Sequence, residues 1–493
     1  MTRVLTLTLL AVLALSAPAA AASERDTMRA YAADTWRSFE LMTDPHTGLP
    51  SDNVSEDGVR SRYTSPTNIG TYLWSTIAAR DLGIIKRGEA YTRMARALDS
   101  VAQLERHGQS GQFYNWYDPE TRQKLTTWPV NGDPVYPFLS SVDNGWLGAA
   151  LLMVQRAEPR LREEAGAIER EMNWGFYHDP GADLLRGGAW TEPPPQCNVP
   201  AAYEGDDVYY TCHHYGALNT EPRITSYLGI ADGTVPPTHY FKMWRTFPRT
   251  CDWSWQEQRP EGVTRTYLGV DVFEGHYSYR GMDLVPSWGG SMFEALMVPL
   301  LVPEEEWGPR SWAVNHPLHV RAQQEHGLEE ADYGYWGFSP SNNPDGGYRE
   351  YGVDPIGLEP NGYASDQQRT HVDYGFGECR PAQPEPTEYG DGVVTPHASF
   401  LALDFDRDGA LENLANLRRD FEVYGEGGFF DAVEVTSGQV SRFWLALDQG
   451  MVMAALANEL KNDRLQRYIA PQLERSVRPL LAMEEFTAGG GGR

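Results

Sequence analysis

One acidic residue stands out by its surroundings. Glu294 lies in an apolar run of helix length, residues 288–302, with Met292, Phe293 and Leu296 as neighbours. A carboxylate in such a setting is costly unless it is paired, protonated or used in chemistry. Glu294 is therefore a candidate for a chemical role, although a surface glutamate on an amphipathic helix fits the same run and is the commoner case.

A second acid, Asp448, has a similar setting between Trp444 and Met453. Two carboxyl groups, one kept protonated by apolar surroundings and one ionised, are what the cleavage of a glycosidic bond requires. Asp431, in a Gly-Gly-Phe-Phe-Asp run, is a third acid nearby in the sequence. We hypothesise that Glu294 works with Asp448, although spacing along the chain does not place them together.

Several polar and aromatic side chains are candidates for sugar binding. Tyr114, Asn115 and Trp116 suit stacking against a sugar ring, although a strand edge with inward aromatics explains them equally well. Asp143 and Glu221 begin predicted helices, where free N–H groups and the helix dipole stabilise a carboxylate, so capping is an equal explanation. The other candidates for substrate contact are Trp146, Arg223, Trp288, Trp336, Ser339 and Tyr351.

The motifs for metals and cofactors lack the ligands they need. Residues 404–409 open like a calcium-binding loop, but Ala415 stands where a bidentate glutamate is required, so we predict a capped turn. His213 and His214 fit metal ligands or a base, but among 12 histidines one adjacent pair is unsurprising. The sequence has no phosphate-binding loop and no metalloprotease motif. We predict neither a metal nor a cofactor.

Charge and processing signals restrict the partners and the compartment. The 493 residues carry a formal net charge of −27, which repels nucleic acid and anionic lipid. Residues 1–22 have the pattern of a secretory signal peptide, and no later run is long enough to span a membrane. We expect a secreted or periplasmic monomer. The four cysteines fit two disulfides, with Cys197–Cys212 and Cys251–Cys379 as one of three connectivities.

Helical spacing and capping signals predict about a dozen helices that would position these residues. They cover residues 25–42, 64–82, 89–107, 140–156, 161–174, 236–244, 288–302, 309–325, 396–403, 410–423, 445–460 and 465–481, with another beginning at Thr220. Long loops rich in Gly, Pro and aromatic residues separate alternate helices, and residues 333–354 favour a binding loop. These features predict an all-α (α/α)6 toroid with its loops on one face. It would be a single domain, residues 23–485, followed by a disordered tail, residues 486–493.

Seven motifs, in order along the chain, resemble those of the glucoamylase-like family. That family includes bacterial endo-β-1,2-glucanases and the related domain of cyclic β-1,2-glucan synthases. The motifs are Ser-Val-Asp-Asn-Gly-Trp-Leu (141–147), Gly-Ser-Met-Phe-Glu-Ala-Leu-Met (290–297), Trp-Gly-Phe-Ser-Pro-Ser (336–341), Tyr-Gly-Val-Asp-Pro-Ile-Gly-Leu (351–358), Val-Thr-Pro-His-Ala-Ser (394–399), Gly-Gly-Phe-Phe-Asp-Ala-Val (427–433) and Asp-Gln-Gly (448–450).

The resemblance implies an (α/α)6 barrel and an inverting glycoside hydrolase that cleaves a β-glucan, with β-1,2-glucan as the leading substrate. It implies that Glu294 is the general acid, that Asp448 is the late carboxylate with Asp431 as the second choice, and that Asp143 lines the −1 subsite. This sequence departs from the family where relatives usually carry Tyr and Pro in place of Ala295 and Val298. It also has Met451 after Asp-Gln-Gly and an unfamiliar insertion at residues 362–392.

Three other functions remain open at this point. The first is hydrolysis of another bacterial polysaccharide on the same fold. The second is a polysaccharide lyase, which needs a cationic subsite for uronates and is disfavoured by the acidic charge. The third is a non-catalytic glycan-binding protein.

Overall fold

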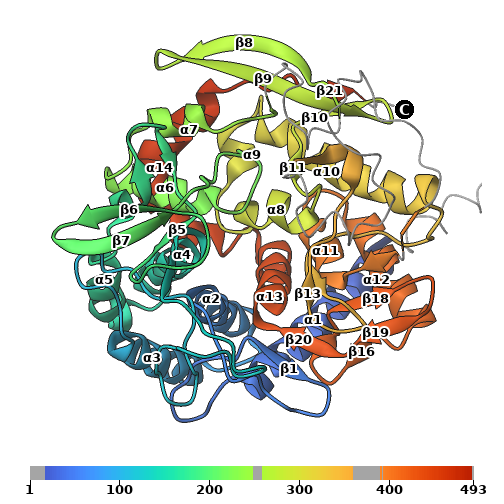
Figure 1. The fold of residues 1–493 in the computed structure, drawn as a ribbon. Coiled ribbons are helices and arrows are strands. Elements are labelled where there is room, and N and C mark those ends of the chain that lie inside the picture. Colours follow the sequence, from blue (N-terminus) through green and yellow to red (C-terminus); the bar gives the residue numbers. More distant parts are fainter. Residues whose placement is uncertain (1–16, 248–257, 359–388, 391, 491–493) are drawn as a thin grey trace, which may run out of the picture.

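The computed structural model describes residues 17–247, 258–358, 389–390 and 392–490 (Figure 1). Most predicted helices are present, with ends within a few residues of those expected. The long helices are α1 (Ala17–Met42), α2 (Pro66–Leu82), α3 (Arg87–Gln103), α4 (Ser141–Ala157), α5 (Arg162–Arg170), α6 (Arg223–Asp232), α10 (Trp312–Glu325), α12 (Arg407–Asp420), α13 (Ala446–Lys461) and α14 (Gln466–Met483). The short helices are α7 (Thr238–Lys242), α8 (Met292–Leu296), α9 (Glu304–Trp307) and α11 (Pro396–Leu401).

Distant parts of the chain are brought together by contacts among α2, α4, α6, α8, α11 and α13 (Figure 1). Helix α2 packs against α4, α4 against α6, α8 against α11, α11 against α13, and α13 against α2. Arg223 of α6 reaches α8, where it donates to the carbonyl oxygens of Glu294 (3.0 Å) and Ala295 (2.7 Å). The first turns of α4, α8 and α13 carry Asp143, Glu294 and Asp448.

The prediction of an all-α fold is incomplete, because the connectors between helices hold more strand than expected. One four-stranded sheet contains β2 (Phe138–Ser140), β5 (Gly188–Trp190), β7 (Asp206–Thr211) and β6 (Asn198–Tyr203) in that order. A second contains β21 (Gly489–Gly490), β10 (Met282–Leu284), β9 (Val270–Tyr279) and β8 (Glu261–Tyr267). In β9 the exposure of the side chains largely alternates, which is the period of a strand with one covered face.

The Cys197–Cys212 disulfide is confirmed and ties β6 to β7, with the two Cα atoms 5.7 Å apart. Cys251 and Cys379 lie outside the described residues, so their pairing stays a prediction.

The boundary predicted for a disordered tail needs correction. Phe486 is buried and packs against the ring of Trp312 with the centroids 5.3 Å apart. Thr487 donates to the carbonyl oxygen of Glu274 (2.6 Å), and β21 then pairs with β10. Residues 486–490 are therefore part of the fold, and 491–493 lie outside the described residues.

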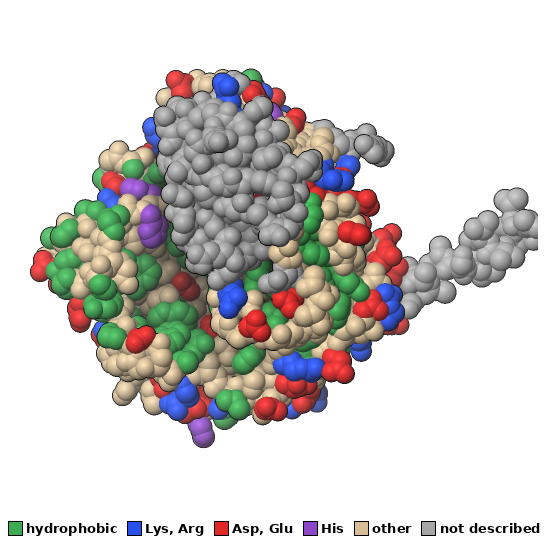
Figure 2. All heavy atoms as spheres, turned by 45° about the vertical axis from the view of Figure 1, so that its right-hand side comes forward, with side chains coloured by type: hydrophobic (Ala, Val, Ile, Leu, Met, Phe, Trp, Pro, Cys, Tyr) green, Lys and Arg blue, Asp and Glu red, His purple; other side chains and the backbone are tan. Residues whose placement is uncertain are grey.

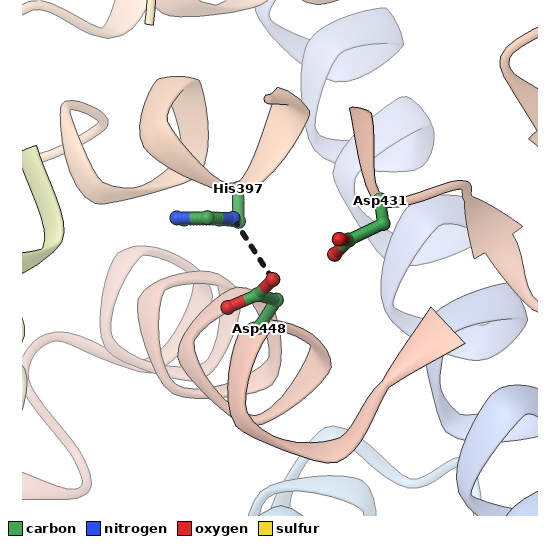
Figure 3. A group of neighbouring side chains, drawn as sticks. All are labelled: His397, Asp431 and Asp448. Atoms are coloured by element: carbon green, nitrogen blue, oxygen red, sulfur yellow. Dashed lines mark ion pairs between the residues drawn. The ribbon is translucent and has the colours of Figure 1, made fainter. Parts of the chain in front are cut away.

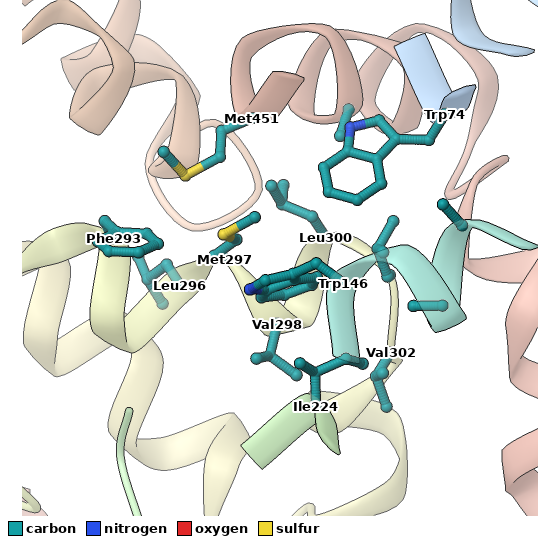
Figure 4. Close-up of a cluster of buried hydrophobic side chains, with 14 of the residues drawn as sticks. Trp74, Trp146, Ile224, Phe293, Leu296, Met297, Val298, Leu300, Val302 and Met451 are labelled. Atoms are coloured by element: carbon teal, nitrogen blue, oxygen red, sulfur yellow. The ribbon is translucent and has the colours of Figure 1, made fainter. Parts of the chain in front are cut away.

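The apolar run around Glu294 is not the single helix that we expected. Helix α8 ends at Leu296, and a 3-10 turn, η3 (Val298–Leu300), follows. Pro299 has no backbone N–H to donate and its ring restricts the preceding residue, so the α-helix does not continue. Figure 4 shows the side chains of α8 and η3 packed with Trp146 of α4 and other apolar residues in the interior.

The described surface carries both charges. Figure 2 shows acidic and basic side chains interspersed along the edge of the face that it draws, with hydrophobic side chains gathered on its left half. Among the described residues no helix combines the length and the hydropathy that a membrane span requires.

Candidate active site

Glu294 begins α8, where the hydroxyl of Ser291 caps the helix by accepting the Glu294 N–H (3.3 Å). Its carboxylate is half-buried and accepts hydrogen bonds from the Thr220 hydroxyl (2.6 Å) and the Glu221 N–H (2.9 Å). Burial raises the pKa of Glu294 to about 7, against the lowering effect of these two donors. Glu294 can therefore hold a proton near neutral pH and still reach a ligand.

Glu221 forms a carboxyl pair with Glu294. It is half-buried, and its Oε2 accepts the indole N–H of Trp146 at 2.5 Å. Burial raises the pKa of Glu221 well above its usual range, and the neighbouring charge of Glu294 raises it further. Two carboxyl groups that interact in this way lose their protons one after the other, so the pair carries at least one proton near neutral pH.

Asp431 and Asp448 form a second carboxyl pair, with only 2% and 1% of their surface exposed. Both oxygens of Asp448 and the Oδ1 of Asp431 lack a hydrogen-bond partner, while the Oδ2 of Asp431 accepts the Asn342 N–H (2.5 Å). Burial raises the pKa of Asp431 to about 6 and that of Asp448 well above its usual range, where the charge of Asp431 adds to the effect. This pair therefore shares one proton, with Asp431 as the more readily ionised member.

His397 lies beside this pair (Figure 3), and its tautomer follows from its hydrogen bonds to Thr395 and Ser339. The only hydroxyl proton of Thr395 is donated to the carbonyl oxygen of Asp431 (2.7 Å), so the His397 Nδ1 must donate its own proton to Thr395 (2.7 Å). The Nε2 accepts from Ser339 (3.0 Å). Burial lowers the pKa of His397 to about 3, so the ring is neutral with its proton on Nδ1, 3.4 Å from Asp448.

His397, Asp431 and Asp448 could also be considered as cation ligands, since one atom of each lies within 4.8 Å of the others. The histidine nitrogen that faces the carboxylates is the protonated Nδ1, which has no lone pair to give. A metal would have to break its hydrogen bond to Thr395 and remove that proton. The arrangement fits a proton shared by two carboxyl groups better than a metal centre.

Asp143 and Asp52 are two further acids whose charges act on the carboxyl pairs. Asp143 accepts from the Thr67 hydroxyl (2.6 Å) and, with the Asn115 amide oriented to satisfy its neighbours, from the Asn115 side chain (2.8 Å). Burial raises the pKa of Asp52, and the charge of Asp143 adds to this effect. The charge of Asp52 in turn raises the pKa of Asp431.

Tyr348 is an aromatic residue whose pKa responds to charges of both pairs. This side chain belongs to β13 (Tyr348–Arg349), which pairs with β12 (Ser341–Asn342), and 49% of its surface is exposed. Burial of its hydroxyl group raises the pKa of Tyr348 well above its usual range, and the charges of Asp448 and Glu221 add to the effect. The charge of one member of each pair therefore acts on the same phenol.

Two predicted substrate contacts are placed elsewhere by the structure. Arg223 is 1% exposed and donates two hydrogen bonds to Glu304, at 2.8 and 2.9 Å, so it has no surface for a substrate, contrary to expectation. Ser339 is fully buried and accepts the N–H of Phe293 (3.1 Å) while it donates to His397. Arg223 instead holds the backbone of Glu294, and Ser339 holds the ring of His397.

The other predicted contacts differ in exposure. Trp146, Trp336, Tyr351 and Tyr114 are buried, with 0, 2, 4 and 7% of their surfaces exposed. Of these, Trp146 reaches the site through its N–H to Glu221. Asn115, Trp116 and Trp288 are half-buried and remain candidates for contact.

The remaining sequence motifs have structural roles. Asp406 caps α12 by accepting the Gly409 N–H (3.1 Å), which confirms the capped turn. The Nε2 of His214 contacts Asp179 of β3 (His178–Asp179) at 2.9 Å, and β3 pairs with β4 (Leu184–Leu185).

Sequence reasoning missed Asp52, His397 and Tyr348. The signal for His397 was present, because it belongs to the Val-Thr-Pro-His-Ala-Ser motif, and Tyr348 belongs to the predicted binding loop. Asp52 lies in an irregular connector before β1 (Asn53–Ser55) and carries no local signal. Its position depends on the Asn68 side chain of α2, which donates to it at 2.9 Å.

Comparison with family models decides the family. A model named Glycoamylase and described as putative glucoamylase matches residues 213–470, which is more than half of the chain. The chain belongs to this glycoamylase family. Residues 30–176 match a second family, described as a protein of unknown function (DUF3131). The family resemblance inferred from the seven motifs is therefore confirmed.

Individual relatives agree with the glycoamylase assignment. The cyclic β-(1,2)-glucan synthase NdvB of Rhizobium meliloti (strain 1021) is 25% identical over 90% of this chain, which spans only 18% of that relative. A putative glucoamylase from Bacteroides uniformis ATCC 8492 has a TM-score of 0.65 at 16% identity, covering 93% of this chain and 97% of that one. The endo-β-1,2-glucanase from Chitinophaga pinensis, solved with sophorotriose and glucose, has a TM-score of 0.62 at 15% identity, covering 92% and 98%. At these identities the structures show a shared fold.

Proposed function

We propose that this protein is a glycoside hydrolase that cleaves a β-glucan, and that it is an endo-β-1,2-glucanase. The observation that carries the proposal is the presence of two carboxyl pairs of different character, one with Glu294 and Glu221 and one with Asp431 and Asp448. One pair is half-buried and hydrogen-bonded, and the other is buried and lacks partners. Membership of the glycoamylase family and the fold shared with an endo-β-1,2-glucanase support the substrate class.

In the proposed reaction Glu294 is the general acid and protonates the oxygen of the leaving sugar. A water molecule attacks the anomeric carbon from the opposite face, and the Asp431–Asp448 pair accepts its proton. This gives inversion, for which acid and base lie about 6.5–9.5 Å apart. The raised pKa of Glu294 supports the acid role, and the lower pKa of Asp431 within its pair supports Asp431 as the base, with Asp448 holding the shared proton.

The remaining proposals concern architecture and compartment. We propose that the six inner helices, with their outer neighbours, form an (α/α)6 toroid, as their successive contacts and Figure 1 support. We also propose that residues 1–22 are a signal peptide and that residues 23–485 with the short β21 segment form one domain. The Cys197–Cys212 disulfide supports an oxidising compartment, secreted or periplasmic. We propose a monomer that needs no metal or cofactor.

The test replaces Glu294 by glutamine and measures release of reducing ends from linear β-1,2-glucan. Loss of the proton donor should lower kcat by about 10²- to 10⁴-fold. Glu305→Gln is the matched control, because Glu305 is also half-buried with its pKa raised to about 7 by burial. It belongs to α9, outside both pairs, and should leave activity unchanged. Equal activity of Glu294→Gln and wild type would remove Glu294 as the acid.

A further inference from the structure

A cleft lined by aromatic side chains lies in the connector between α3 and β2. Its volume is about 300 Å³, at the lower end of the range for small-molecule sites, roughly 300–1,000 Å³. The aromatic walls are Trp116, Trp128, Tyr136, Phe138 and Trp190, all of them half-buried. Each ring therefore keeps part of its surface available in the cleft.

The first wall is held by Tyr63. The ring of Trp128 lies 4.6 Å from that of Tyr63, and the ring of Trp116 lies 5.6 Å from it in an edge-to-face contact. Trp116 and Trp128 also contact each other edge to face at 5.2 Å. Rings fixed in this way lose little freedom when a ligand binds, which lowers the entropic cost of binding.

The second wall comes from the sheet that precedes α4. Phe138 of β2 and Trp190 of β5 are directly opposite each other in the antiparallel register, with ring centroids 4.7 Å apart. Strand β5 also pairs with β7, which the Cys197–Cys212 disulfide ties to β6. The second wall is therefore part of a braced four-stranded sheet.

The rim of the cleft is polar and almost uncharged. Asn131, Asp133 and Gln196 line it and are exposed, and Asp133 is the only charged residue among those lining the cleft. Flat aromatic walls with amides at the rim suit a ligand that has an apolar face and hydroxyl groups at its edge. A hexose ring has this chemistry.

The cleft is joined to the acids through Asn115. The Asn115 side chain donates to Asp143 at 2.8 Å and accepts the indole N–H of Trp116 at 3.3 Å. The backbone N–H of Asn115 donates to the carbonyl oxygen of Phe138 (2.8 Å). One residue thus touches both walls of the cleft and one of the acids.

We propose that this cleft is a distal subsite that binds glucosyl units of the same β-glucan chain. The inference rests on the proposed function and adds to it where the chain lies beyond the point of cleavage. Proline-rich peptides also stack on aromatic grooves, but the connection to Asp143 through Asn115 favours the glucan. The subsite would favour long chains over short ones.

The test measures kcat and KM of Trp128→Ala and Trp190→Ala on linear β-1,2-glucan and on short β-1,2-linked oligosaccharides. Loss of one stacking ring should raise KM for the long chain on the order of tenfold and leave kcat unchanged. The shortest substrates, which do not reach the cleft, should be unaffected. Trp244→Ala is the control, since it removes an exposed indole (36%) that does not line the cleft. Trp128→Phe keeps a flat ring and should recover most of the KM, which separates stacking from folding.

Calorimetry of the same variants in the Glu294→Gln background gives a readout that does not need catalysis. Weaker binding of linear β-1,2-glucan by Trp128→Ala would support the subsite even if the wild type cleaved nothing, in which case only the proposed reaction fails. Equal KM and equal binding in all variants, equal losses for short and long substrates, or binding of a proline-rich peptide but not of glucan would overturn the subsite.

Discussion

The two carboxyl pairs differ in what surrounds them. Glu294 and Glu221 are half-buried, and their oxygens accept from a hydroxyl, a backbone N–H and an indole. Asp431 and Asp448 are almost fully buried, and three of their four oxygens lack a partner. Donors lower a carboxyl pKa and burial raises it, so similar groups acquire different tasks. The first pair can contact a substrate. In the second pair the two carboxyl groups must share a proton with each other or with water.

The largest expected effect comes from breaking the second pair. Asp431→Asn should lower kcat on linear β-1,2-glucan by about 10²- to 10⁴-fold, because it removes the base. Asp448→Asn should lose activity to a similar degree, because the shared proton is lost. If the two act as one unit, the double variant will be no worse than the poorer single variant. Fully additive losses would contradict a shared role.

A smaller effect is expected when one hydrogen-bond donor to the first pair is removed and the burial of the pair is kept. Thr220→Val removes the hydroxyl that donates to Glu294 at 2.6 Å and should raise the pKa of Glu294 further. Because Glu294 must be protonated to act, activity should then persist to higher pH, by about one unit. The measurement is the basic limb of kcat/KM against pH. Thr220→Ser, which keeps the hydroxyl, should behave as wild type, and a shift in the opposite direction would contradict this role.

The second pair should also lower the free energy of unfolding at neutral pH. The raised pKa of Asp448 means that the folded state binds more protons than the unfolded state, so its contribution to stability falls as pH rises above the unfolded value. Asp448→Asn should therefore raise Tm by a few degrees at pH 7 and by less at pH 4. Asp57→Asn, at an exposed acid, is the control and should change neither. A lower Tm at pH 7 would contradict an uncompensated buried carboxyl.

The smallest expected effect is that of a chelator. The Nδ1 proton of His397 leaves the second pair without a histidine lone pair for a cation. Treatment with EDTA followed by dialysis should leave kcat and KM on linear β-1,2-glucan unchanged. If EDTA abolished activity and a divalent cation restored it, the second pair would hold a metal and not a shared proton.

Local signals explain why the helices were predictable. Helix α2 begins where the Ser65 hydroxyl accepts the Asn68 N–H with Pro66 at the first position, and it ends at Gly83 in a left-handed conformation (φ 82°). Such signals lie within a few residues of the helix ends. The hairpin of β8 and β9 was missed as regular structure because its outer strand is exposed and offers no apolar pattern.

The site was predictable only in part. Glu294 and Asp448 are marked by apolar neighbours in the sequence, and their motifs resemble family motifs. Asp52 and His397 gain their roles from residues elsewhere in the chain, such as Ser339, whose hydroxyl donates to the His397 Nε2. The burial of Arg223 could not be foreseen either, because its partner Glu304 lies 81 residues away.

The most direct test of the central claim is the pH dependence of kcat/KM on linear β-1,2-glucan. One pair gives a proton and the other takes one, so activity should fall as pH drops through about 6, where Asp431 is protonated, and as pH rises through about 7, where Glu294 loses its proton. The account predicts a narrow bell whose basic limb alone moves in Thr220→Val. A profile with one limb, or a basic limb that Thr220→Val leaves in place, would contradict it.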